Sequence, residues 1–416
     1  MKLVSIKIRN FRIYKDETTI SLGDLNCVIG KNDIGKSTIL EALNIFFNDG
    51  IEKTDISVNA EDETIEMTCI FDDFKEQIVL DSTVETSLQE ESLLNQNGLL
   101  EIKKTFRIGG TITKSTFIVA NHETHEKLLN ILTLKNSPLK SLASELNVDL
   151  TGINKTKNPP IRKAIKLHLE SPKAMLELKV DGSLDTENNL KAVWSKLKDY
   201  LPIFTLFKVD KTINDKDKDV QDPMNQAIKE TLAIPEIKAL LDKIEEEIKA
   251  KSTIVAEHTL EKLKEIDPSL AEKMKSDFSK LPSWDKIFDL TLLNENNVPL
   301  NKRGSGVKRL VLLSFFQAQA EKKKIDNSAP SIIYAIEEPE TAQHPNHQKI
   351  LINSLINLSE RANIQVMFTT HSANLVREIP MESLIYIHKG QGDINTIEYG
   401  IDFETEKLNE ETIDRI

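Results

Sequence analysis

Residues Gly30 to Ser37 read G-K-N-D-I-G-K-S and match the phosphate-binding pattern G-x-x-x-x-G-K-[ST] at every defined position. The preceding run, LNCVIG, is apolar and predicts a strand, whereas the following run, STILEALNIFF, has apolar residues at helical spacing and predicts a helix. A glycine loop between a strand and a helix turns backbone N–H groups toward a phosphate chain. The octamer therefore predicts a nucleotide site, in which Lys36 reaches the β- and γ-phosphates and the Ser37 hydroxyl binds Mg²⁺. The alternative is a glycine turn that matches by chance, and the flanking strand and helix argue against it.

The composition indicates a large cytoplasmic protein. The chain has 416 residues, of which 29% are charged and 39% hydrophobic, enough for roughly two or three domains. The first residues alternate apolar and basic side chains and do not resemble a signal peptide, and no apolar run has membrane-spanning length. Two isolated cysteines, Cys27 and Cys69, provide neither a disulfide framework nor a zinc pattern. The net charge of −12 disfavours generic binding of nucleic acid, although a local basic groove stays open.

The pattern along the chain predicts an α/β protein with an insertion. Residues 1–124 are rich in strands and contain the phosphate loop. The run LVSIKIRNFRIYKDETTISL alternates like an antiparallel hairpin, and Gly109-Gly110 is the expected turn of another hairpin. Residues 125–285 read as charged helices with apolar stripes, which predicts a helical insertion that meets a second copy or a partner. Residues 286–416 return to alternating strands and helices, and we expect them to complete the sheet begun by residues 1–124. Within the insertion, Asp215, Asp217 and Asp219 alternate with lysines, a pattern that indicates a solvated loop more than a metal site.

Two acids follow a second apolar run, SIIYAIEEPE, at residues 331–340. Carboxylates at the carboxyl end of a buried strand can hold Mg²⁺ and orient an attacking water beside a nucleotide. We assign Glu337 to the metal and Glu338 to the water. The alternative is a cluster of surface acids at a strand end, which the phosphate loop makes less attractive.

Two further features lie in the last third of the chain. His371 comes directly after the strand-like run QVMFTT and could contact the γ-phosphate, although a lone histidine is often structural. Ser305 and Gly306 open an amphipathic helix, whose first N–H groups could form a second anion site. The alternative there is an ordinary helix start with Ser305 as the N-cap.

The chain resembles a known family at these motifs. The stretch IKIRNFRIYKDETTISL…NCVIGKNDIGKSTILEAL is similar to the start of RecF/SMC-type ABC ATPases, and RGSGVKRL resembles their signature motif. AIEEPETAQHPNHQ and FTTHSANLV resemble the OLD-type ATPases, including those of the Gabija and PARIS anti-phage systems. The resemblance implies an ABC-type P-loop ATPase head, with a mixed sheet and an antiparallel β lobe, that binds ATP and Mg²⁺ and acts as a homodimer or higher homo-oligomer.

The resemblance also implies roles for single residues. Ser305 and Gly306 would act on the nucleotide of a second subunit, Glu338 would be the catalytic acid, and His371 the switch histidine. His344-Pro345 would belong to the D-loop. Residues implied to bind the nucleotide are Gly30, Lys31, Asn32, Asp33, Gly35, Lys36, Ser37 and Thr38.

The sequence departs from the family pattern at several positions. Glu337 stands where an Asp is usual, Gln343 where a Leu precedes His-Pro, and Ala373 where a Pro often follows the histidine-serine pair. OLD nucleases also continue into a Toprim domain with a strand followed by Glu-Gly, and no Glu-Gly dipeptide occurs here. We therefore expect either a stand-alone ATPase with a separate effector, such as a Toprim-type nuclease, or the ATPase portion of a longer nuclease.

Three functions follow from these patterns. The first is an ATPase that serves as sensor or scaffold in phage defence and controls a separate effector. The second is a RecF-like DNA-repair ATPase, which the negative charge disfavours. The third is a binding module with a structural nucleotide, which the intact Glu338 disfavours.

Overall fold

The computed structural model describes residues 1–58, 60–80, 85–181, 190–207, 235–268, 331–341, 345–390 and 395–400, together with residues 232 and 314. The chain divides into two compact units. The first unit comprises Met1–Asp210 and Phe316–Ile416, and the second comprises Lys211–Phe315. The candidate site discussed below lies entirely in the first unit.

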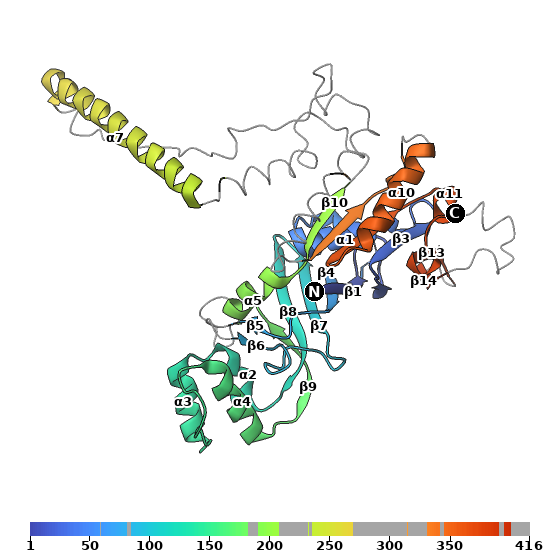
Figure 1. Ribbon diagram of the computed structural model, residues 1–416, viewed down its shortest axis with the longest axis horizontal. Helices are drawn as coiled ribbons and strands as arrows, with labels where there is room; N and C mark the ends of the chain where they lie inside the picture. The colour runs from blue at the N-terminus through green and yellow to red at the C-terminus, as the bar shows by residue number, and fades with distance from the viewer. Residues whose placement is uncertain are drawn as a thin grey trace. The chain divides into compact units, whose positions relative to one another are not determined.

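The first unit contains a six-stranded sheet that carries the phosphate loop (Figure 1). Its order is β10-β11-β12-β3-β13-β14, and all neighbours are parallel except β13 and β14. The strands are β3 (Leu25–Gly30), β10 (Ile203–Phe207), β11 (Ile332–Ile336), β12 (Ile364–Thr369), β13 (Leu384–Lys389) and β14 (Asn395–Tyr399). Because parallel strands end at the same edge, the loops after β3, β11 and β12 come together there.

The central strands of this sheet are almost continuously apolar, as expected for strands buried on both faces. Every residue of β3 and of β12 is buried. The prediction that the C-terminal part of the chain completes the sheet of the phosphate loop is confirmed, since β3 lies between β12 and β13.

A second six-stranded sheet is antiparallel throughout and forms the β lobe. Its order is β2-β1-β4-β7-β8-β9, and β5 (Ile78–Val79) and β6 (Glu85–Thr86) form a separate small ribbon. The lobe strands are β1 (Lys2–Arg9), β2 (Thr18–Ser21), β4 (Thr64–Asp72), β7 (Leu100–Ile108), β8 (Ile112–Glu123) and β9 (Lys173–Lys179). The predicted hairpins are confirmed: β1 pairs with β2, and β7 pairs with β8 across Gly109-Gly110.

Helix α1 (Lys36–Asn48) packs between the two sheets. At its C-terminal end, the Phe47 ring stacks on Phe204 of β10 with the ring centroids 5.4 Å apart, and its edge-on contact with Phe71 of β4 has a centroid distance of 6.2 Å. The Lys104 ammonium of β7 donates to the backbone carbonyl of Phe46 and lies over the Phe46 ring. These contacts fix the helix that follows the phosphate loop against both layers of the ATPase head.

The other helices that the structure describes in the first unit range from 4 to 15 residues. Helices α2 (Glu126–Leu129), α3 (Asn136–Glu145) and α4 (Asn158–Leu169) share a small apolar core of their own, which includes Leu139 and Ile161. Helix α5 (Lys191–Leu197) precedes β10, whereas α10 (Pro345–Ser359) packs on β12 and α11 (Ala373–Val376) follows it. Short 3-10 turns occur at Lys53–Asp55, Ile131–Thr133, Lys198–Tyr200 and Met381–Ser383.

The expected helical insertion over residues 125–285 is wrong for its first part. Strand β9 pairs with β8 in the lobe, and β10 pairs with β11 in the ATPase sheet, so the first unit extends to Asp210. The short run IFTLF forms β10, and an apolar run of that length is compatible with either a strand or a helix by pattern alone. Only the neighbouring strand decides between them.

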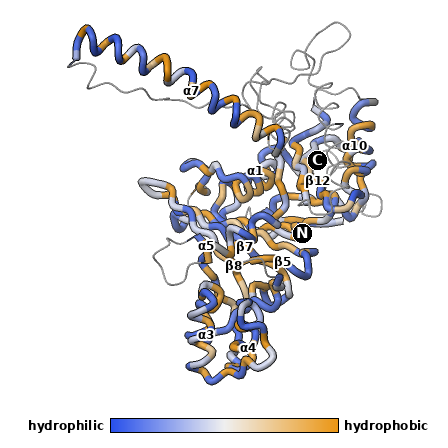
Figure 2. The backbone as a smooth tube through the Cα atoms, turned by 60° about the vertical axis from the view of Figure 1, so that its left-hand side comes forward, coloured by the Kyte–Doolittle hydropathy of each residue, from blue (hydrophilic) through white to orange (hydrophobic). Residues whose placement is uncertain are grey.

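The second unit is described mainly through α7 (Pro235–Ile266), a helix of 32 residues. Figure 2 shows hydrophobic and hydrophilic residues alternating along it. Several of its apolar side chains are exposed, among them Leu240, Ile244, Ile248 and Val255. The Asp215–Asp219 loop lies outside the described residues. In the part of the chain that the structure describes, no helix is both long enough and apolar enough to cross a membrane.

Candidate nucleotide-binding and active site

The phosphate loop depends on two glycines with positive φ angles. Gly30 has φ 148° and Gly35 has φ 101°. A Cβ atom at Gly30 would lie 2.4 Å from the Ile387 carbonyl oxygen, and one at Gly35 would lie 2.7 Å from the Ile13 Cγ2 atom. Both positions therefore require glycine, for conformation and for space. The Tyr14 hydroxyl donates to the Gly35 carbonyl over 3.1 Å and holds the turn that opens α1.

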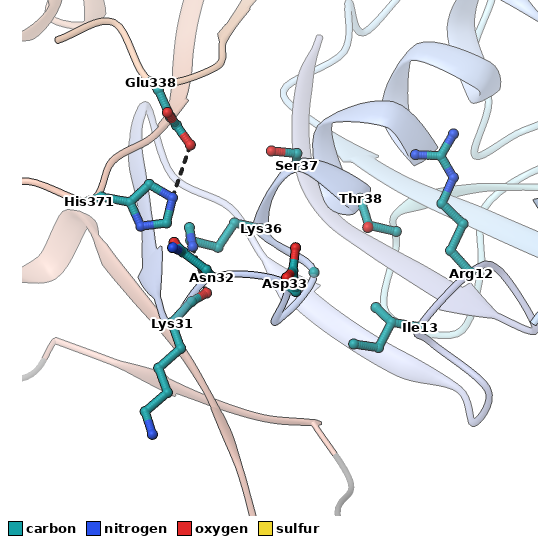
Figure 3. A pocket seen from close by; sticks show the side chains of 11 residues that line it. Arg12, Ile13, Lys31, Asn32, Asp33, Lys36, Ser37, Thr38, Glu338 and His371 are labelled. Atoms are coloured by element: carbon teal, nitrogen blue, oxygen red, sulfur yellow. Dashed lines mark hydrogen bonds and ion pairs between the residues drawn. The ribbon is translucent and has the colours of Figure 1, made fainter. Parts of the chain in front are cut away.

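A cleft of about 1020 Å³ opens above this loop (Figure 3). Helix α1 begins at Lys36, and its first turn has no acidic residue, so its N-terminal N–H groups present a positive end to the cleft. The residues that line the cleft are Arg12, Ile13, Lys31, Asn32, Asp33, Gly35, Lys36, Ser37, Thr38, Glu338 and His371.

Lys36 is buried and held by the loop itself. Its ammonium donates to the carbonyl oxygens of Gly30, over 2.8 Å, and Lys31, over 2.7 Å. Burial lowers the pKa of Lys36 to about 8, while nearby carboxylates, Glu338 foremost, oppose that shift. Among the described residues, the hydrogen-bond acceptors of this ammonium are neutral carbonyls, and with a helix N-terminus in the same cleft it is suited to bind an anion.

Glu338 and His371 meet on the opposite wall of the cleft. Their side chains come within 2.9 Å between the Glu338 Oε1 and His371 Nε2 atoms, and Figure 3 shows both facing Lys36 and Ser37. The two residues follow β11 and β12, which are neighbours in the sheet. Glu338 has φ 37°, a left-handed conformation that is strained for a glutamate and typical of functional loops.

The structure brings together most, but not all, of the residues assigned from the sequence. Gly30 does not line the cleft; it contributes to the site through the backbone conformation of the loop and through its carbonyl, which accepts from Lys36. Glu337 also does not line the cleft, and its N–H donates to the Phe207 carbonyl of β10 over 2.8 Å. Ser305, Gly306 and His344 lie outside the described residues, and Pro345 begins α10.

The sequence analysis missed Arg12, Ile13 and Glu340. Arg12 and Ile13 line the cleft from the turn after β1, and Arg12 already pairs with Asp55 over 2.8 Å. Glu340 is buried below the cleft wall and accepts hydrogen bonds from Thr370 and His371. Its place in the run EEPE, two residues after Glu338, was the available signal.

The donor set at the cleft fits Mg²⁺ bound together with a nucleotide. Mg²⁺ prefers oxygen ligands and commonly takes only one or two from the protein, with phosphate and water completing its shell. The Ser37 hydroxyl and the Glu338 carboxylate both face the cleft. Among the described residues, no group of three or more His, Cys, Asp or Glu side chains could hold a metal without such help.

The chain is similar in sequence to known proteins. A family model described as "AAA ATPase domain" matches residues 1–376. The endonuclease GajA of Bacillus cereus (strain VD045) is 24% identical over 404 residues, covering 93% of this chain and 58% of that protein. The chain thus spans 58% of the length of this curated relative.

Two solved structures are also similar. One is the SMC head domain from Thermotoga maritima, with 11% identity, a TM-score of 0.40, and coverage of 97% of this chain and 100% of that chain. The other is an Smc head domain with an extended coiled coil, bound to the C-terminal domain of ScpA and derived from Pyrococcus furiosus. It has 13% identity, a TM-score of 0.44, and 99% coverage of each chain.

Proposed function

The chain belongs to the AAA ATPase domain family, and from this premise we propose that it hydrolyses ATP in the described cleft to control a separate effector in anti-phage defence. The ATPase class is that of the family. The observation that carries the site assignment is the convergence of Lys36, Glu338 and His371 on one cleft. The phosphate loop follows β3, Glu338 follows β11 and His371 follows β12, and these three strands are consecutive in the sheet.

ATP binding would begin with the phosphate chain on the loop. The N–H groups at the start of α1 would donate to phosphate oxygens, and the Lys36 ammonium would exchange one backbone carbonyl for the β- and γ-phosphates. A bond from this ammonium to a phosphate oxygen joins two opposite charges and is stronger than the bond to a neutral carbonyl that it replaces. Asn32 and Asp33 would border the phosphates from the loop, and Thr38 from the first turn of α1.

Mg²⁺ would neutralise phosphate charge and be held by the Ser37 hydroxyl and by a carboxylate of the loop after β11. From the sequence pattern we assign that carboxylate to Glu337. The position of Glu338 in the cleft makes Glu338 the second candidate.

Hydrolysis would use Glu338 as the group that orients water and accepts its proton. The water oxygen would bond to the γ-phosphorus as the bond to the β,γ-bridging oxygen breaks, which yields ADP and phosphate. The contact of 2.9 Å with His371 Nε2 holds the Glu338 carboxylate in one direction. The same imidazole would donate a hydrogen bond to the γ-phosphate, a contact that is present with ATP and absent with ADP.

The defence role rests on the resemblance of the motifs to OLD-type ATPases and on the similarity to endonuclease GajA. One specific observation favours a second candidate, the ATPase portion of a longer nuclease. The matched relative is an endonuclease, and this chain spans 58% of it. A RecF-like repair ATPase is the third candidate, and the net charge of −12 weighs against it.

The test of the site is Glu338→Gln, which preserves shape and removes the carboxylate. We expect ATP to bind as in the wild type, measured by calorimetry, and phosphate release to slow by about 10² or more. Glu378→Gln is a matched control, because Glu378 has a similar side-chain exposure, 40% against 36%, and does not line the cleft. Near-normal turnover in Glu338→Gln would contradict the assignment of the water-orienting role to Glu338.

The test of a separate effector is a plasmid-nicking assay with the purified chain in Mg²⁺ or Mn²⁺. We expect no cleavage, because the acids placed in a defined site are those beside the nucleotide. A pull-down from the native operon, with and without ATP, should then recover the effector. Nicking that is lost in Asp217→Ala but kept in Lys36→Ala would make the chain itself a nuclease.

A further inference from the structure

The loop after β11 is fastened to the end of β12 by hydrogen bonds at Glu338 and at Glu340. The Glu338 N–H donates to the Thr369 hydroxyl oxygen over 3.1 Å. Two residues later, the Glu340 Oε1 atom accepts from the Thr370 hydroxyl over 2.5 Å and from the His371 N–H over 3.0 Å. His371 is therefore held at its backbone by Glu340 and at its ring by Glu338.

Glu340 is placed for this contact and not for the cleft. Its residue exposure is 8%, and it does not line the cleft. Its backbone carbonyl accepts from the Gln348 side chain of α10 over 3.3 Å, which fixes the main chain of the loop. Its second carboxylate atom, Oε2, is buried and has no hydrogen-bond partner within the described ranges of the chain. The side-chain hydrogen bonds of Glu340 to described residues are therefore the two that Oε1 accepts.

We propose that Glu340 is a positioning residue for the ATPase reaction, which fixes the backbone of His371 and thereby the contact between His371 and Glu338. This inference rests on the proposed roles of His371 and Glu338 in hydrolysis. Without the Oε1 acceptor, the His371 N–H and the Thr370 hydroxyl lose their partner. The backbone of His371 is then less well fixed, and its imidazole no longer keeps its position beside the Glu338 carboxylate.

The first test is a double-mutant cycle in kcat with Glu340→Ala and His371→Ala. We expect Glu340→Ala alone to lower kcat by about 10- to 100-fold, the scale seen for residues that orient directly acting groups. The KM for ATP should stay near the wild-type value, because Glu340 does not face the nucleotide. In the His371→Ala background, Glu340→Ala should cause little further loss, since the group on which it acts is gone.

The second test is rescue by Glu340→Gln. The amide oxygen of glutamine can accept the same two hydrogen bonds, so kcat should return close to the wild-type value. Glu101→Ala is the matched control, because Glu101 is also 8% exposed and accepts from Lys7 and Asn95 in the β lobe. It should lower the unfolding temperature and leave kcat unchanged.

These measurements separate the possible failures. If His371→Ala hydrolyses ATP normally, the proposed role of His371 is wrong. If His371→Ala is slow and Glu340→Ala adds its full effect, or if Glu340→Gln is as slow as Glu340→Ala, the positioning role of Glu340 is wrong. Should Glu340→Ala fail to fold, Thr370→Val removes one of the two donors and keeps the side-chain shape. An unchanged kcat in Thr370→Val would then overturn the proposal.

Discussion

The side-chain amide of Asn395 donates a hydrogen bond to the backbone carbonyl of Ile34 over 3.1 Å, across 361 positions of sequence. Ile34 is part of the phosphate loop, and Asn395 begins β14. On the same hairpin, the Ile387 carbonyl of β13 closes the space above Gly30. The β13–β14 hairpin thus supports the phosphate loop from one side, although it lies beyond the residues matched by the family.

We predict that Asn395→Ala weakens ATP binding without changing the fold. The loss of one net hydrogen bond, about 0.5–1.5 kcal/mol, corresponds to an increase in Kd of about 2- to 10-fold if the loop is less ordered without it. Calorimetry with ATP measures this change. Glu398→Ala, on the same strand and exposed, is the control. Equal affinity for Asn395→Ala and wild type would show that the loop keeps its shape without this support.

Lys36→Ala should abolish ATP binding, whereas Lys31→Ala should retain most of it. Lys36 is buried under the phosphate position, but Figure 3 shows the Lys31 side chain pointing away from Lys36 and Glu338. Lys31 serves the site through its carbonyl, which accepts from Lys36. Both variants remove one lysine charge from the same loop. A difference in ATP affinity between them, measured by calorimetric titration, therefore reports where the ammonium lies and not the loss of charge alone. If Lys36→Ala bound ATP with wild-type affinity, the assignment of this loop as the ATP-binding site would be wrong.

Lys104 should make folding stability depend on pH. Burial lowers the pKa of Lys104 to about 8, and the unperturbed value is 10.5. The unfolded chain therefore binds more protons between these values, and wild-type stability should rise with pH across this window relative to Lys104→Met. The rise should be at most about 3 kcal/mol.

Urea unfolding of both proteins at intervals from pH 7 to 10.5 measures this difference. The exposed Lys140→Met variant controls for loss of a lysine. The free energies of unfolding of wild type and Lys104→Met could also differ by the same amount at every pH. That result would mean that Lys104 has the same pKa in the folded and unfolded chains.

We predict that the active site is completed by a second copy of the chain. The helix start that the sequence predicts at Ser305 and the start of α1 would each present a positive end to the phosphates, and one γ-phosphate can be held by both only from opposite sides. Ser305→Arg and Lys36→Ala should each be inactive, and their mixture should recover part of the ATPase rate. No recovery with mixed dimers present would argue for a site within one chain.

Local sequence was sufficient to predict those strands whose pattern is complete within a few neighbouring residues. Alternation identified the β1–β2 and β7–β8 hairpins, and apolar runs identified β3, β11 and β12. It failed for β9, whose residues KAMLELK are largely exposed and form no apolar run, and for β10, whose run IFTLF is compatible with either a strand or a helix inside a stretch read as helical. These two strands exist through their pairing with β8 and β11, which lie far away in sequence.

The sequence by itself determined the phosphate loop, because glycine conformation, the lysine and the following helix are all local properties of eight to twenty residues. It also located the two acids and the histidine, each at the end of an apolar run. Only the tertiary structure decided that Glu338 rather than Glu337 faces the cleft, that Glu340 is buried behind His371, and that Asn395 reaches Ile34. The reason is physical: side-chain direction after a strand depends on the backbone turn and on the neighbouring strand, and strand order is set by burial across the whole sheet.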